Sequence, residues 1–594
     1  MNNQNSDCRI VARWTGLALV PVLSVFLFPW RADAVGYWTA LENKAPDSVQ
    51  LMLLLSDGTV MAANNPCDVF GGKGQDWYRL TPDISGGYAN GTWTSLASMH
   101  DTRLFYSSAV LPDGRVFIAG GEYGSGRATA EMYYPFTDTW TQINPPVSLL
   151  DPNAHSPVLA ALDETGNQGF LDSGCVVLPD GRVLVAPVAP NTRGGTLVYD
   201  PAANTWSAGP MTRSSYQDEA SWVKLPDDSI LTIDPFGTNT ERYIPALNQW
   251  IADQPAPTPL YSPVGGEMGP AFLLPDGRAF FLGGSGHTAY YTPSGGISQG
   301  TWTIGPDIPG GLTASDSPAA MMANGKILCA VAPPPYLDGG KTQFPTPTSF
   351  FEFDPVANAF ERASGPTGTL NDDIPSYLCT MLDLPDGTVL YCHVEQGNVF
   401  YSGFGSQLYL YHPDGAPLAA GKPTLTSSKW NPDASLHLTG KLFNGISQGA
   451  AFGDDAQMDS NYPLARFINS RGSVWYGRTF NWSSTSVMTG NRPATTEVGR
   501  PWYLAPGWYS LTVVANGISS DPIPFYGPVW VDFNSFAVFP DGSFVQPYWT
   551  VTDGGTAVDA GGTIAVMSGL SHEKMTISKP MTIIAVDGPV TIGQ

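Results

Sequence analysis

Seven times along this chain a short apolar run ends at an acidic or amide-bearing turn, and a second apolar run follows the turn. The turns recur about every 47 to 67 residues, a period typical of four-stranded propeller blades. In the second unit the turn is Pro112-Asp113-Gly114, where proline presets φ and glycine accepts a positive φ. The repeat therefore predicts an all-β fold built on a seven-bladed β-propeller. The turns are Asp57-Gly58, Asp113-Gly114, Asp180-Gly181, Asp227-Asp228, Asp276-Gly277, Asn324-Gly325 and Asp386-Gly387.

The two ends of the repeat region complement each other. In several units a tryptophan follows the third apolar run, as Trp206 follows Tyr199, but none follows Tyr411 in the last unit. A spare tryptophan, Trp38, precedes the first unit. The strand around Trp38 is therefore predicted to be the outer strand of the last blade, because closing the ring in this way removes a sheet edge. A leading strand unrelated to the ring is the alternative.

The N-terminus has the pattern of an export signal. Arg9 and Arg13 precede an apolar run over residues 17–28, and Ala32-Asp33-Ala34 offers small residues at the cleavage spacing. We expect a signal peptide over residues 1–34 and a secreted, periplasmic or cell-surface protein with no membrane span after cleavage. An uncleaved anchor is the alternative.

The chain is acidic but sparsely charged. Charged residues make up 13% of its 594 residues, and the formal net charge is −24. Such a surface repels phosphate backbones, so nucleic acid is not an expected partner. The charge would attract cations, although acidity that serves only solubility is the simpler interpretation.

After the predicted signal peptide, the pattern of apolar runs and turns divides the chain into three regions. The propeller is predicted over residues 35–422, and residues 423–527 alternate apolar and polar positions without the blade turn, which predicts an immunoglobulin-like sandwich. Residues 528–594 hold very short strand candidates and predict a short β-helix-like tail. So few coils cannot bury a core alone, so the tail is expected to dock on the sandwich or on a partner. The tail's strand candidates are residues 562–567, 574–577, 581–585 and 590–592.

Two cysteines suggest a disulfide. Cys379 and Cys392 flank the Asp386 turn almost symmetrically, which predicts a cross-strand disulfide in an oxidising compartment. Of the six cysteines, Cys8 would leave with the signal, so an odd number remains and at least one thiol should be free.

Residues just before each innermost strand of a propeller line one mouth of its channel, and here many of them are polar. Convergent carboxylates at such a mouth can bind a divalent cation or hydrogen-bond sugar hydroxyls, and they can raise one another's pKa. Ordinary solvated loop acids are the alternative. The candidate mouth residues are His100, Arg103, Tyr106, Asp172, Asp218, Glu219, Glu267, Asp316 and Tyr377.

Two stretches carry a resemblance to a known family. The stretch from Thr102 to Phe117 is similar to a blade-opening strand of the galactose oxidase and glyoxal oxidase family, and Ser376 to Gly387 lies where that family has a Tyr-His pair before the same turn. The family combines a seven-bladed kelch-type propeller with a C-terminal immunoglobulin-like domain. The resemblance covers roughly residues 35–527 and implies the same architecture here.

The resemblance also implies a copper ion held by two tyrosines and two histidines, with one tyrosine crosslinked to a cysteine. Tyr377 matches one tyrosine, but Leu378 replaces the adjacent histidine and has no lone pair for a metal. The sandwich loop expected to supply the second histidine matches residues 474–482, which contain none. No counterpart of the crosslinked pair is found. Because copper(II) sites with N and O ligands need imidazole or a comparable donor, we expect no copper and no other cofactor, with a divalent cation as the alternative.

These features predict a secreted, non-catalytic kelch-type propeller that binds a glycan or a protein partner at the channel mouth. The alternative is a galactose oxidase-like oxidase, or another carbohydrate-active enzyme, with a divergent metal site.

Overall fold

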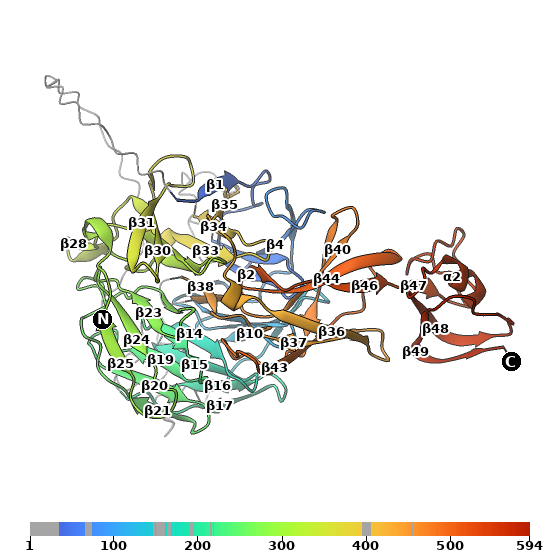
Figure 1. Cartoon of the computed structure of the whole chain (residues 1–594). Helices are drawn as coiled ribbons and strands as arrows, with labels where there is room; N and C mark the ends of the chain where they lie inside the picture. Colours follow the sequence, from blue (N-terminus) through green and yellow to red (C-terminus); the bar gives the residue numbers. More distant parts are fainter. Residues whose placement is uncertain are drawn as a thin grey trace, which may run out of the picture.

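The fold is nearly all β and is described from a computed structural model of the chain. The described residues are 35–65, 74–146, 149, 161–162, 168–169, 171–188, 195–213, 217, 219–394, 405–452 and 456–593. At a few of these residues the structure describes the backbone but not the side chain. The predicted signal peptide, Cys67 and Asp218 lie outside these residues. Within them, no helix combines the length and the apolar character that crossing a bilayer requires. In Figure 1 the propeller, the sandwich and the tail follow one another along an elongated molecule.

Seven four-stranded antiparallel units form the propeller, as the turn repeat predicted, and in blades 1 to 6 the innermost strand comes first in the chain. Blade 1 comprises β2 (Val49–Leu54), β3 (Val60–Asn64), β4 (Trp77–Thr81) and β5 (Thr92–Ser95). Blade 2 comprises β7 (Ser107–Val110), β8 (Val116–Ala119), β10 (Ala130–Tyr134) and β11 (Thr139–Gln142). Blade 3 comprises β14 (Leu171–Val177), β15 (Val183–Val188), β16 (Leu197–Asp200) and β17 (Thr205–Ala208).

The remaining blades repeat this order. Blade 4 comprises β18 (Trp222–Lys224), β19 (Ile230–Ile233), β20 (Thr240–Ile244) and β21 (Gln249–Ala252). Blade 5 comprises β22 (Ala271–Leu273), β23 (Ala279–Leu282), β24 (Thr288–Thr292) and β25 (Thr301–Ile304). Blade 6 comprises β26 (Pro318–Met321), β27 (Ile327–Val331), β30 (Thr348–Asp354) and β31 (Ala359–Ala363). Blade 7 comprises β33 (Cys379–Asp383), β34 (Val389–His393), β35 (Tyr409–His412) and β1 (Tyr37–Ala40).

The outer strand of blade 7 therefore comes from the start of the described chain. β1 pairs antiparallel with β35, and Trp38 lies opposite Tyr411. The two rings lie 4.8 Å apart, and Trp38 Nε1 donates to Ser364 O at 2.7 Å. Other blades pair a tyrosine with a tryptophan at the same place, as Tyr199 pairs with Trp206. Such cross-strand aromatic pairs stabilise the outer half of a blade.

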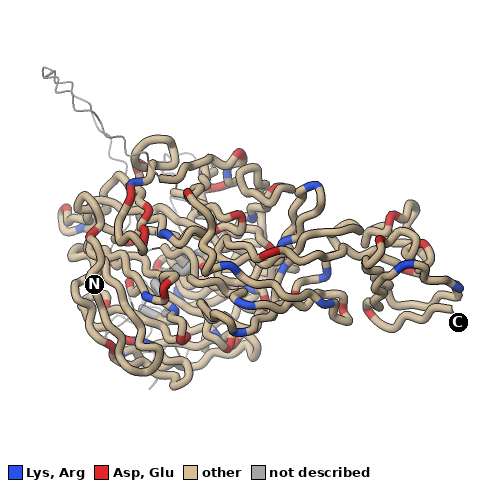
Figure 2. Tube along the Cα trace, in the orientation of Figure 1, with Lys and Arg blue, Asp and Glu red and all other residues tan. Residues whose placement is uncertain are grey.

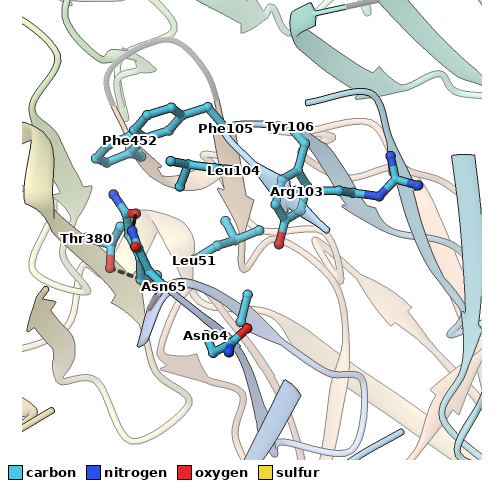
Figure 3. Close-up of a pocket in the computed structure, with 11 residues that line it drawn as sticks. Leu51, Asn64, Asn65, Arg103, Leu104, Phe105, Tyr106, Thr380 and Phe452 are labelled. Atoms are coloured by element: carbon cyan, nitrogen blue, oxygen red, sulfur yellow. Dashed lines mark hydrogen bonds between the residues drawn. The ribbon is translucent and has the colours of Figure 1, made fainter. Parts of the chain in front are cut away.

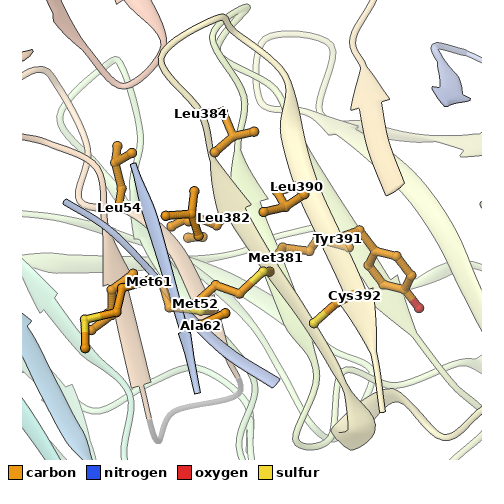
Figure 4. Close-up of a cluster of buried hydrophobic side chains, with 14 of the residues drawn as sticks. Met52, Leu54, Met61, Ala62, Met381, Leu382, Leu384, Leu390, Tyr391 and Cys392 are labelled. Atoms are coloured by element: carbon orange, nitrogen blue, oxygen red, sulfur yellow. The ribbon is translucent and has the colours of Figure 1, made fainter. Parts of the chain in front are cut away.

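Apolar side chains fill the space between neighbouring blades. Figure 4 shows part of a buried cluster that includes Met52 and Met61 of blade 1 and Met381 and Leu390 of blade 7, with Met52 lying beside Met381. All four are buried, which is expected because both faces of an inner blade strand are covered.

The predicted disulfide between Cys379 and Cys392 is wrong. β33 and β34 pair with Cys379 opposite His393 and Cys392 opposite Thr380, so the two cysteines are offset by one residue and point to opposite faces of the sheet. Both thiols are free and buried. The Cys379 sulfur lies 3.0 Å from the Tyr391 hydroxyl, and burial raises the pKa of Cys392 to about 12.

Two sheets form the sandwich after the propeller. One comprises β36 (Thr424–Trp430), β37 (Leu436–Lys441), β43 (Pro493–Val498) and β42 (Thr479–Phe480). The other comprises β41 (Val474–Gly477), β40 (Leu464–Asn469), β44 (Gly507–Ala515), β45 (Ile518–Ser519) and β46 (Ile523–Gly527). Leu438, Phe467 and Leu511 contribute to the core of this sandwich.

The sandwich covers the face of the propeller that carries the blade turns. Thr479 N donates to Ser56 O at 3.1 Å, and Arg478 lies 2.8 Å from the Asp57 carboxylate of the first turn. We call this the turn face. The innermost strands begin at the opposite end of the propeller, which we call the mouth.

The tail is a parallel three-stranded coil. β47 (Val529–Val531), β48 (Thr563–Ser571) and β49 (Thr582–Ile592) pair in that order, with the short helix α2 (Val551–Ala557) packed beside them. Two long strands thus replace the four short ones predicted from residue 562 onward. The tail's core includes Tyr526 from the sandwich, so the tail docks on the sandwich.

Short elements complete the described chain. They are β6 (Arg103–Leu104), β9 (Tyr123–Gly124), β12 (Ala161–Leu162), β13 (Gln168–Gly169), β28 (Tyr336–Asp338), β29 (Lys341–Gln343), β32 (Asn371–Asp372), β38 (Gly449–Phe452), β39 (Ala456–Asp459), η1 (Pro309–Gly311), η2 (Ser376–Leu378) and η3 (Ala419–Gly421).

Candidate functional site at the propeller hub

A hairpin from the sandwich occupies the centre of the propeller. β38 pairs antiparallel with β26 of blade 6, and β39 pairs with β38. Residues 474–482, which the resemblance matched to the histidine-bearing loop, lie instead on the turn face. The segment that does enter begins with small residues, Gly449, Ala450 and Ala451, which suit a crowded axis. Gly449 has φ 119, and an added Cβ would meet Ser460 Oγ at 2.5 Å.

A small pocket lies where this hairpin reaches the mouth side of the hub. Phe105 and Phe452 stack at 5.7 Å, with their ring planes 8° apart, on one side of it. Figure 3 shows these rings facing Asn64 and Asn65 across the pocket. The pocket volume is ≈ 30 Å³, enough for one or two water molecules. The other lining residues are Gln50, Leu51, Ala63, Arg103, Leu104, Tyr106 and Thr380.

Three buried polar atoms on residues that line this pocket have no hydrogen-bond partner among the described residues. They are the Tyr106 hydroxyl, Asn65 Oδ1 and Arg103 Nε, on residues that are 5%, 3% and 1% exposed. The Asn65 amide nitrogen donates to Gln50 Oε1, which fixes its orientation. Burial raises the pKa of Tyr106, so its hydroxyl keeps its proton and is a donor. The Tyr106 hydroxyl and Asn65 Oδ1 thus offer one donor and one acceptor within largely apolar walls.

Arg103 lines this pocket, but the terminal nitrogens of its guanidinium group bind backbone carbonyls and an acid of blade 2. Its side chain is 0% exposed and donates to the carbonyls of Gly120 at 2.7 Å and Gly126 at 2.6 Å. Its other terminal nitrogen lies 3.1 Å from Glu131, which is also 0% exposed. Both terminal nitrogens of Arg103 are therefore engaged by protein groups, whereas its Nε has no partner among the described residues.

His100 is attached to the same carboxylate. Its Nδ1 lies 2.6 Å from Glu131 Oε2, and its side chain is 52% exposed. Glu131 also accepts from the backbone N–H of His100 at 2.9 Å. His100 is therefore held at the surface by a buried acid that sequence reasoning had not singled out.

The predicted mouth acids form no single cluster in the part of the chain that the structure describes. Asp316 N donates to Met268 O at 3.0 Å, which brings Asp316 beside Glu267. Tyr377 is near as well, because burial and, to a smaller extent, the Asp316 carboxylate raise the pKa of its phenol. Glu219 comes from another blade. Asp172 contributes its backbone to β14, with its side chain not described, and Asp218 lies outside the described residues.

The donors around Tyr377 do not fit a copper site. No three His, Cys, Asp or Glu side chains gather at a metal-sized spacing in the described residues. Leu378 is buried, and the described parts of the hub hairpin contain no histidine. His393 is held by Asp372 at 2.6 Å, as His100 is held by Glu131. Among the described residues, no group of three such donors is therefore available to copper(II) around Tyr377.

Buried charges lie deeper in the hub, below the pocket. Lys224 of β18 is 2% exposed, and its Nζ donates to Val177 O at 2.8 Å and Thr485 O at 3.0 Å. Burial raises the pKa of Asp459 to about 6, against the opposing effect of the Lys224 charge. Burial also raises the pKa of Asp383 to about 8. Lys224 thus joins blades 3 and 4 to the sandwich from inside the hub.

The repeat held a signal for two of these groups. The last residue of the innermost strand is apolar in five blades, but it is Lys224 in blade 4 and Asp383 in blade 7. A charge at a repeat position that is otherwise apolar indicates a special environment. The hairpin that surrounds these charges could not be inferred from that position alone.

Comparisons with known proteins give a distant likeness only. No protein-family profile matches the sequence. No curated protein matches it either. Among solved structures that match is a fungal alcohol oxidase of the AA5 family in complex with copper, at 14% identity and a TM-score of 0.46, over 83% of this chain and 99% of that one. A likeness at this level assigns no residue role to this chain.

Proposed function

We propose that this protein is a secreted, non-catalytic binding protein whose hub pocket recognises a hydroxyl-bearing group of a neutral glycan, without copper. The observation that carries the proposal is the pair of orphaned polar atoms, the Tyr106 hydroxyl and Asn65 Oδ1, in a pocket otherwise walled by Phe105 and Phe452.

A sugar hydroxyl is both a donor and an acceptor, so it satisfies both atoms at once. Leaving either atom buried without a partner costs about 1–3 kcal/mol. The pocket admits one substituent and not a whole ring, so the rest of the sugar would lie on the mouth surface, where Tyr377 contacts Phe344. In the free protein a water molecule fits the same position and is displaced by the hydroxyl.

The charge of the chain supports a neutral ligand. The formal net charge of −24 disfavours anionic glycans through long-range repulsion. Figure 2 shows acidic residues spread over the propeller, the sandwich and the tail rather than gathered in one patch. Repulsion of anions is therefore a property of the whole surface.

Glycan-array binding followed by titration of the bound glycan tests this proposal. Tyr106→Phe removes only the hydroxyl and should weaken binding about tenfold, which corresponds to 1.4 kcal/mol. Tyr503→Phe is the matched control, because the Tyr503 hydroxyl is also buried without a partner in the described residues but belongs to the sandwich. Equal affinity of Tyr106→Phe and the unmodified protein, or selective binding of anionic glycans, would contradict the proposal.

A further inference from the structure

Among the described residues, no strand pairs with the outer edge of the tail sheet. On the β47 side the edge is covered, because Trp530 N donates to Gly542 O at 2.8 Å and Tyr548 N donates to Trp530 O at 3.0 Å. On the other side β49 pairs only with β48 among the described residues. An edge strand of this kind presents a row of unpaired backbone groups, which is a template for another strand.

The first half of β49 lacks the features that usually protect such an edge. Thr582–Val586 reads Thr-Ile-Ile-Ala-Val, without charge, proline or glycine. The next residue, Asp587, is bound by Arg500 of the sandwich at 2.9 and 2.5 Å, so its charge is neutralised. Gly588 and Pro589 follow within β49, where its register with β48 shifts, so regular pairing with another strand would be confined to Thr582–Val586.

Exposed apolar side chains are also frequent in the tail as a whole: five lie within residues 536–549 on the covered β47 side, and Ile583 lies on β49. Eight of the 21 large apolar side chains exposed in the described residues lie in the tail, which is about a tenth of the chain. A monomeric soluble surface rarely gathers apolar groups in this way, so the tail, more than the propeller, has the character of an interface. The eight are Phe536, Val538, Phe539, Val545, Trp549, Leu570, Ile577 and Ile583.

We propose that two copies of this chain associate tail to tail through antiparallel pairing of β49 with β49. An antiparallel pair centred on Ile584 places Thr582 opposite Val586 and Ile583 opposite Ala585, so one sequence complements itself about a two-fold axis. Such a contact is isologous and closes at the dimer. The paired side chains are β-branched or small, which suits cross-strand packing.

Charge and shape favour a second copy at this place. Two chains that each carry −24 repel one another over most of their surfaces, and Thr582–Val586 is a charge-free strip. Figure 1 shows the tail at the end of the molecule opposite the mouth side of the propeller. A tail-to-tail dimer therefore keeps both mouths free.

Sedimentation equilibrium or light scattering of the full chain at micromolar concentration tests the proposal. The expected result is a dimer that Ile583→Lys converts to monomer, with association weakened at least about tenfold, because a lysine on an edge strand opposes pairing. Ala585→Glu is a second variant at an exposed position of the same strand. Ile304→Lys is the control, since Ile304 is 65% exposed and lies on β25, the outer strand of blade 5.

Circular dichroism checks that each variant remains folded. A monomeric wild-type chain, or a dimer unaffected by both Ile583→Lys and Ala585→Glu, would overturn the proposal. Binding of a monomer to vesicles of neutral phosphatidylcholine would overturn it as well, and would assign the apolar residues of the tail to a lipid surface.

Discussion

Glu131→Gln should lower the free energy of unfolding by about 3 kcal/mol or more, because it leaves the Arg103 guanidinium buried without its counter-charge. Both side chains are 0% exposed, so solvent cannot compensate. The remaining acid near Arg103 is Asp101 at 3.6 Å, which is farther away than Glu131 and 18% exposed. The decrease in the free energy of unfolding should therefore exceed the decrease expected when a surface ion pair is removed.

Urea unfolding at neutral pH, followed by tryptophan fluorescence, measures this effect. The control is Asp113→Asn in the same blade, which removes the exposed partner of Arg115 at 2.6 Å and should cost under about 1 kcal/mol. If Glu131→Gln and Asp113→Asn lower the free energy of unfolding by the same amount, the buried Arg103–Glu131 pair does not stabilise the protein more than a surface ion pair, which contradicts the prediction. A second measurement, affinity for the glycan, should change little provided that the variant remains folded.

Asp383→Asn should stabilise the protein at pH 8 by several kcal/mol, and it should flatten the pH dependence of stability. Burial raises the pKa of Asp383 to about 8 from an ordinary value of 3.8. Between these values the folded state binds the proton more tightly than the unfolded state, so this group makes stability fall as pH rises from about 4 to about 8. The full span corresponds to roughly 5 kcal/mol.

The geometry explains the direction of this effect. Asp383 is 3% exposed, and its Oδ2 accepts from Ser460 Oγ at 3.3 Å, while its Oδ1 has no partner among the described residues. Asn stays neutral at any pH, so it removes the cost of burying an anion.

Thermal unfolding measured from pH 4 to pH 8 tests the sign. The wild-type protein should lose stability over this range relative to Asp383→Asn, and the two should converge near pH 4. Asp276→Asn, at an exposed carboxyl in another blade turn, should follow the wild-type profile. A variant that is less stable than wild type at pH 8 would mean that Asp383 is stabilised as an anion.

The propeller was predictable because its signal is local and repeated. Each turn contains a residue suited to positive φ, such as Gly58 at φ 74, and each turn is flanked by apolar runs of strand length. The position of Trp38 followed from a missing partner for Tyr411. Both arguments rest on residues that are close in sequence and on a pattern that recurs in every blade.

The hub was not predictable in the same way. Its hairpin, β38 and β39, is far in sequence from β26, with which it pairs, and only its small residues hint at a crowded environment. The proposed disulfide was wrong because a register shift of one residue exchanges the faces of a strand, and the turn spacing around Asp386 did not fix that register. Arg103 lines the hub pocket, but its buried partner Glu131 lies on another strand and could not be inferred from the residues around Arg103.

The account depends on the hub being a binding pocket and not a copper centre. The most direct measurement loads the purified full chain with copper(II), removes free metal and determines both the bound copper and the hydrogen peroxide produced from sugars or aldehydes. The account predicts copper well below one ion per chain and no peroxide above the background of Tyr377→Phe. One copper per chain, lost in Tyr377→Phe and accompanied by peroxide production, would contradict it.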